Sequence, residues 1–180
     1  MKTRMLILFG LIVAIFTSCN LNNGSSNYTP EIYLYTSHIN KTDTLNVYLT
    51  DESGVLRLDT ISVGDTIVLR MFLNGITNNL TNFYLTQSDT TVAKILLPAV
   101  VSMDSIFSKP QSDYNAGRFV FLQNKKQVYF PVRYIAKKAT TTATLQFSVV
   151  SDAVFDNSSG SNSDSFKLKT PIIVKRNAVK

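Results

Sequence analysis

The sequence predicts an all-β protein, and three observations support this. After residue 19, no run of ten residues repeats apolar positions with the 3.6-residue period of a helix. Short β-branched and aromatic segments recur instead, separated by turns rich in Gly, Asn and Asp. Several of them alternate apolar and polar residues, as strands with one buried face do. About nine strands at a spacing of roughly ten residues are typical of a β-sandwich or a barrel.

Alternation is clearest in two segments. In residues 142–150, Leu145, Phe147 and Val149 alternate with polar neighbours. In residues 66–73 the apolar residues are nearly continuous, which predicts a central strand. In chain order, the expected strands are residues 32–35, 44–50, 55–60, 66–73, 80–86, 92–97, 118–122, 128–135, 142–150 and 166–175.

Other segments are harder to assign. Residues 100–107 fit either a strand or a short helical turn, and residues 109–117 are expected to form a loop. Pro131 lies inside the strand at residues 128–135. Because Pro donates no ladder hydrogen bond, it predicts an edge or bulged strand there. Asn124-Lys125-Lys126 predicts a hairpin turn leading into that strand.

The first nineteen residues, MKTRMLILFGLIVAIFTSC, have the layout of an export signal. Lys2 and Arg4 precede an apolar run from Met5 to Phe16. A membrane-spanning helix needs about 20 apolar residues, so this run is short for a span and fits a signal helix. The segment ends at Cys19, the only cysteine of the chain. Once Cys19 is modified, no thiol remains for a disulfide.

The ending Phe16-Thr17-Ser18-Cys19 resembles the lipobox of bacterial lipoproteins, with Phe16 where that family has Leu, Val or Ile. The resemblance implies cleavage before Cys19, acylation of that residue, and anchoring in the cell envelope at the outer membrane. Several acyl chains make such anchoring stable. Residues 1–18 are then the signal peptide, residues 19–30 a lipidated flexible tether, and residues 31–180 a single domain.

The strand pattern resembles the immunoglobulin-like sandwiches found in lipoproteins of the Bacteroidetes type. The resemblance is carried by residues 61–66, 142–150 and 166–175, and it implies an antiparallel β-sandwich. The Trp and the Cys pair of antibody domains are absent. The alternative is an up-and-down barrel that carries a small apolar ligand. Lipoproteins of this type carry an acidic cluster after the Cys when they are exported to the surface. The tether has no acid before Glu31, so the periplasmic and surface faces both remain open.

The charge is uneven along the chain. Residues 19–117 carry a formal charge of −4, and residues 118–180 carry +8. The simpler interpretation of the basic half is that its lysines lie exposed on strands, where they discourage edge-to-edge pairing. A basic half also attracts anionic partners such as acidic polysaccharide or lipid phosphates. A protein outside the cytoplasm is not expected to bind nucleic acid.

The sequence carries no recognisable catalytic constellation. His38 is the only histidine, and no G-x-S-x-G motif accompanies it. We expect His38 to lie in an exposed loop, and a hydrolase that uses it is the weaker alternative function. One histidine and a modified cysteine do not make a zinc site. We therefore expect a protein that is not an enzyme and holds no metal or cofactor.

Asp followed by Ser or Thr and then by Ala, Ile, Leu, Val, Met or Thr occurs five times. This pattern is similar to the O-glycosylation sequon of exported Bacteroidetes proteins. The same pattern also describes an Asp that ends a turn before a strand, and the two interpretations are compatible. The resemblance implies glycan attachment at Thr44, Thr60, Thr66, Thr90 and Ser105.

The last expected loop, residues 151–165, is longer than a usual hairpin connection. Its candidate binding residues are Asp152, Phe155, Asp156 and Asp164. A second candidate is a sugar-stacking face, although alternation assigns many of these rings to the core or to sheet faces. Its members would come from Tyr28, Tyr33, Tyr35, Tyr48, Phe83, Tyr84, Tyr114 and Tyr129. We thus expect a lipid-anchored envelope module that is structural or binds a protein or a glycan.

Overall fold

The computed structural model describes residues 27–39, 45–50, 54–156 and 160–174. In these residues, twelve strands and one short helix form two main sheets and a small two-stranded sheet. The predicted all-β sandwich is confirmed. The two main sheets are separate, so the alternative of a closed barrel is wrong. The expected signal helix, and Cys19 with it, lies outside the described residues.

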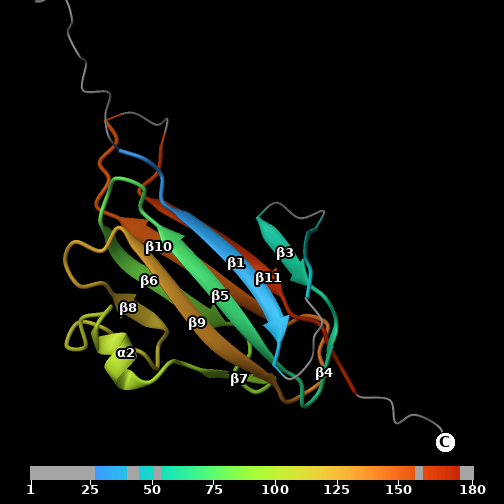
Figure 1. The fold of residues 1–180 in the computed structure, drawn as a ribbon. Coiled ribbons are helices and arrows are strands. Elements are labelled where there is room, and N and C mark those ends of the chain that lie inside the picture. Colours follow the sequence, from blue (N-terminus) through green and yellow to red (C-terminus); the bar gives the residue numbers. More distant parts are fainter. Residues whose placement is uncertain (1–26, 40–44, 51–53, 157–159, 175–180) are drawn as a thin grey trace, which may run out of the picture.

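One sheet has four antiparallel strands. In spatial order they are β1 (Glu31–His38), β5 (Thr66–Asn74), β9 (Gln127–Ala136) and β7 (Ala93–Leu96). Figure 1 shows β1, β5 and β9 side by side in front of β10 and β6. Every second residue of β5 is fully buried, so the predicted central strand is confirmed.

The second sheet has six strands and is mixed. Its β3–β11 pair is parallel, as is the pair of the small sheet, β4 (Ile61–Ser62) with β12 (Ile172–Ile173). The other ladders of the molecule's described part are antiparallel. The spatial order is β2 (Val47–Leu49), β3 (Val55–Leu58), β11 (Ser163–Lys169), β10 (Thr144–Ser151), β6 (Leu80–Gln87) and β8 (Arg118–Val120).

The inner faces of the two sheets form one apolar core. The burial pattern of β10 confirms the alternation expected for residues 142–150. At one end of the core, the Phe107 ring lies 5.2 Å from both Phe119 and Phe130, measured between ring centroids. Edge-to-face packing of aromatic rings adds to the energy of burying them. Phe107 thereby fixes the segment that precedes β8.

That segment contains α2 (Val100–Asp104), so the ambiguous stretch forms a short helical turn and not a strand. Met103 is its buried residue and anchors it to the core. No helix among the described residues has the length and apolar character needed to span a membrane.

Two local expectations about residues 124–135 are wrong. β9 is an interior strand, paired with β5 on one side and with β7 on the other. It tolerates Pro131 because the β7 ladder ends at the Leu96–Arg133 pair, so no strand flanks Pro131 on that side. The turn at Asn124 does not make a hairpin either. It carries the chain from β8 in the six-stranded sheet to β9 in the other sheet.

Candidate functional site

Four aromatic side chains lie together on the outer face of the four-stranded sheet. We call Tyr33, Tyr35, Phe72 and Tyr129 the tyrosine face. Alternation directs them outward, because their neighbours along β1, β5 and β9 point into the core. The exposed fractions are 43% for Tyr33, 64% for Tyr35 and 53% for Tyr129. These rings are therefore available to a ligand.

The register of the ladders aligns three of these rings in one row. Tyr33 pairs with Phe72, and Phe72 pairs with Tyr129. The Tyr33 and Phe72 rings are tilted by 39°, with their centroids 6.2 Å apart. Tyr33 and Tyr129 are two strand spacings apart, about 9.6 Å. The row thus forms an apolar platform across three strands, with the half-buried Phe72 between two exposed tyrosines.

A hydrogen-bonded polar row borders the platform on one side. The Tyr33 hydroxyl donates to Glu31 Oε2 at 2.6 Å, and the Asn74 amide donates to the same oxygen at 3.4 Å. The Gln127 amide donates to Asn74 Oδ1 at 3.2 Å. The bond to the Glu31 carboxylate raises the pKa of Tyr33. These bonds fix the Tyr33 ring before any ligand arrives.

The other side of the platform is cationic. Tyr35 pairs with Arg70, which in turn pairs with Pro131. Arg133 lies two residues further along β9, beside Leu96 of β7. The Arg70 guanidinium donates a hydrogen bond to the Ser37 hydroxyl, which holds it against the sheet.

A groove of about 720 Å³ runs over these arginines. Its floor is the sheet surface around Pro131, and one wall is the segment that leads from β7 to α2. The residues that line it include Val68, Arg70, Arg133, Leu96, Pro98 and Ala99. Platform and groove together form a site with an aromatic half and a cationic half.

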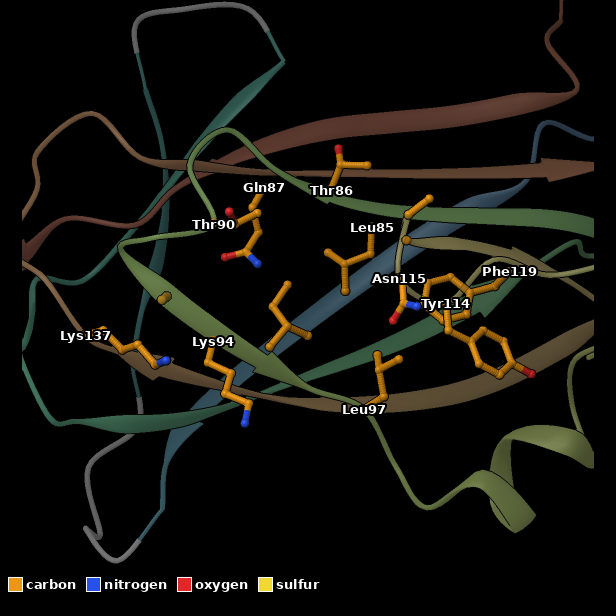
Figure 2. Close-up of a pocket in the computed structure, with 14 residues that line it drawn as sticks. Leu85, Thr86, Gln87, Thr90, Lys94, Leu97, Tyr114, Asn115, Phe119 and Lys137 are labelled. Carbon is orange, nitrogen blue, oxygen red and sulfur yellow. The ribbon is translucent and has the colours of Figure 1, made fainter.

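A second cavity of about 530 Å³ lies between the two sheets, where β7 and β6 face each other (Figure 2). Leu85, Ile95, Leu97 and Phe119 supply apolar surface to it. Gln87 lies at its rim, and the Gln87 Oε1 atom is buried without a hydrogen-bond partner. This cleft can accept an apolar group and offers one acceptor oxygen to a donor on that group.

The candidate binding loop is shorter than expected and its described part is tied down. β10 extends to Ser151 and β11 begins at Ser163. Asp152 accepts hydrogen bonds from the Asn79 backbone and side chain at 2.7 and 2.8 Å. Asp164 accepts one from the Ile32 N–H at 3.2 Å. These two carboxylates serve to connect strands.

Among the described residues of the loop, the other two candidates, Phe155 and Asp156, make no contact with Asp152 or Asp164 that would form a site. Phe155 is half-buried, and a side chain added at Gly160 would meet its ring at 2.2 Å. Asp156 is exposed. No cluster of metal-ligating side chains occurs in the residues that are described. The four candidate residues therefore do not converge on one site in the part of the loop that the structure describes.

Of the Asp-Ser/Thr motifs among the described residues, the one at Asp65 directly precedes a strand, whereas Asp104 ends α2. Asp59, Asp65 and Asp89 each accept a hydrogen bond from a nearby backbone N–H. Thr60, Thr90 and Ser105 are exposed, Thr66 is half-buried, and Thr44 lies outside the described residues. Glycan attachment at these positions stays a prediction.

His38 is not in an exposed loop, so that expectation is wrong. It is the last residue of β1, and only 9% of its side chain is exposed. Its Nε2 lies 3.5 Å from Asp65 Oδ2, and neither ring nitrogen has a hydrogen-bond partner. Among the described residues, no Ser or Thr hydroxyl forms a hydrogen bond with either ring nitrogen of His38.

Of the aromatic residues named from the sequence, three lie exposed on this face: Tyr33, Tyr35 and Tyr129. Tyr28 and Tyr48 are exposed elsewhere, Phe83 is in the core, and Tyr84 and Tyr114 are half-buried. Phe72, Arg70 and Arg133 belong to the site but were not named as candidates. The alternating burial along β5 puts Arg70 and Phe72 on the same outer face. Only the register shows what lies beside them.

Comparisons with known proteins add little. No protein-family model and no curated protein sequence matches the chain. A solved structure of domains 4 and 5 of the S-layer protein SbsC matches with a TM-score of 0.32 and 12% identity. The match covers 77% of this chain and 54% of that one, so the chain spans about half of that structure. We base no argument about function on a likeness of this size.

Proposed function

We propose that this chain is a lipid-anchored, non-catalytic envelope protein whose sandwich binds a glycan on the tyrosine face. The proposal of an envelope location rests on the signal layout and on Cys19. The proposal of a glycan rests on one observation, the row of Tyr33, Phe72 and Tyr129 across three strands.

Sugar rings have one apolar face of C–H groups and a rim of hydroxyls. The exposed rings of Tyr33 and Tyr129 can pack against this apolar face, because stacking buries both surfaces from water. The polar row of Glu31, Asn74 and Gln127 beside the platform offers carboxylate and amide groups to the hydroxyls. Exposed apolar patches rimmed by polar residues are typical of interaction sites.

Replacing one platform ring tests the proposal. Tyr129→Ala is expected to weaken glycan binding about tenfold or more, because an aromatic contact is worth about 1.5–3 kcal/mol. The measurement is calorimetric titration of the full-length protein in detergent with a panel of neutral and acidic oligosaccharides. Tyr48→Ala is the matched control, since Tyr48 is 49% exposed on the other sheet. Equal binding by both variants, or no binding by the wild type, would refute the proposal.

A second candidate function is the binding of a small apolar ligand in the inter-sheet cleft of Figure 2. The apolar walls of Leu85, Ile95 and Leu97 favour it. A fluorescent fatty-acid probe should bind the wild type, and Leu97→Trp should block it by filling the cleft. If the probe binds both proteins equally, this cleft is not its site.

A further inference from the structure

The two arginines of the cationic half indicate the charge of the ligand, which the aromatic half does not. Arg70 and Arg133 project from neighbouring strands on the same face of the sheet. Arg70 lies opposite Pro131, two positions before Arg133, so the two arginines are diagonal neighbours across the ladder. Such neighbours are about 7–8 Å apart at the backbone, within reach of one shared anion for side chains this long.

No carboxylate within the described residues neutralises this pair. Neither Arg70 nor Arg133 is within salt-bridge distance of an Asp or Glu there, where the ion pair found is His38 with Asp65. Lys94 of β7 adds a third cation near the same edge, opposite Ile135. Like charges held this close repel one another, and an anion between them removes that cost.

The charges on the face are also polarised along the strands. Glu31 lies on the far side of the aromatic row, and the arginines lie on the near side. A ligand with an acidic group is therefore accepted in one orientation. Its anion lies over Arg70 and Arg133, and its uncharged ring lies over Tyr33, Phe72 and Tyr129.

The groove supports the same orientation. Both arginines line it, together with the apolar wall of Pro98 and Ala99. Apolar walls reduce the solvation of an anion and strengthen its hydrogen bonds to a guanidinium, whose planar fork matches a carboxylate in a bidentate way.

From these observations we infer that the ligand is an acidic oligosaccharide, with a sugar carboxylate bound between Arg70 and Arg133 and the adjoining sugar stacked on the tyrosine face. This inference rests on the proposed function and adds to it the chemical class of the glycan. Sulfated glycans and anionic lipid surfaces share the negative charge, and the experiment separates them.

The test compares three oligosaccharides of equal length by calorimetric titration of the full-length protein in detergent: a galacturonate trimer, a neutral galactose trimer and a sulfated galactose trimer. A further arm measures binding to vesicles of anionic lipid. The wild type is expected to bind the galacturonate trimer about tenfold more tightly than the neutral trimer, or better, which is the effect of one charge-assisted contact. Arg133→Gln and Arg70→Gln should each remove this preference. Tyr129→Ala should weaken the binding of both the galacturonate and the neutral trimer.

Arg118→Gln is the matched control, because it removes an exposed guanidinium from β8 of the other sheet. It should keep the wild-type preference. Thermal melts of all variants should match that of the wild type, which excludes loss of fold as the cause.

Each other outcome has a distinct meaning. If the galacturonate and neutral trimers bind equally and only Tyr129→Ala matters, the inference is overturned and the proposed function stands. If none of the trimers binds, both are overturned. Stronger binding to a sulfated trimer, or arginine-dependent binding only to vesicles of anionic lipid, also overturns the inference of a carboxylate sugar.

Discussion

At the residue scale, Tyr48 and Asp59 show how a surface hydrogen bond changes acid–base behaviour. The Tyr48 hydroxyl donates to Asp59 Oδ1 at 2.6 Å, and the Asn46 N–H donates to Oδ2 at 2.7 Å. Both bonds stabilise the carboxylate over the acid, so they lower the pKa of Asp59. The same carboxylate raises the pKa of Tyr48. Asp59 thus links β2 to the end of β3.

We expect Tyr48→Phe to raise the pKa of Asp59 toward its ordinary value. Because the folded pKa is lower than the unfolded one, the bond contributes stability that is lost as the pH falls below about 4. The variant should be less stable at neutral pH and lose less stability on acidification. NMR titration of the Asp59 carboxyl carbon measures the shift. Tyr129→Phe is the control, and an identical titration in Tyr48→Phe would contradict the prediction.

Single residues also show where sequence reasoning ends. Alternation correctly placed Phe147 inside, where the ring of Phe166 stacks on it at 4.9 Å. It failed for His38, because the strand is longer than its apolar segment of residues 32–35 suggests. Polar residues such as Thr36, which is buried and donates to the Leu45 carbonyl, extend a strand without adding to its apolar pattern.

At the element scale, the turn before β8 depends on one glycine. Gly117 has a φ of +70°, and a Cβ there would lie 2.0 Å from the Leu85 carbonyl oxygen. Leu85 also donates its N–H to the Gly117 carbonyl at 2.9 Å. Gly117 is therefore where the turn makes its close approach to β6, beside the inter-sheet cleft.

Gly117→Ala is expected to destabilise the fold more than Gly64→Ala. Gly64 has a φ of +91° but nothing within 4 Å of an added Cβ, so that change costs only backbone strain, about 1–2 kcal/mol. Gly117→Ala adds a clash with backbone, which raises the cost by a further 1–3 kcal/mol, roughly the price of overpacking. Urea unfolding of both variants gives the two values. Equal losses of stability would contradict this prediction. They would show that β6 moves aside for the added methyl group.

Strands with regular alternation were predicted well, and the exceptions have a common cause. The segments that became β5 and β10 could be assigned from the sequence because each has one buried face. The position of β9 could not, since Pro131 is tolerated only because its partner β7 ends early. The sequence of one strand does not determine the length of the strand beside it.

At the scale of the whole molecule, sheet membership and register decide the site. The tyrosine face brings together residues 33, 72 and 129, which are far apart in sequence. Which distant segments pair depends on how the two sheets share the core. The local apolar pattern of a strand does not identify its partner. The sequence therefore predicted the class of fold and the kind of aromatic residue, but not their arrangement.

The predicted lipid anchor concerns the whole molecule as well. Wild-type protein expressed in a Gram-negative host should incorporate a clickable fatty acid and remain with the membranes. Cys19→Ala should take up no label, because the thiol is the acceptor that the lipobox resemblance implies. Gel fluorescence and membrane fractionation measure both. Lys2→Ala is the control, since it changes the signal without removing the thiol. Label on the Cys19→Ala variant would place any anchor elsewhere.

The placement of β11 has a consequence for how the molecule matures. It is among the last strands to be synthesised, yet it lies between β3 and β10 in the six-stranded sheet. Until it emerges, β2 and β3 have no link to the rest of that sheet. Pairing between segments far apart in sequence forms slowly. We therefore expect β2 and β3 to join the sheet only after β11 has been made.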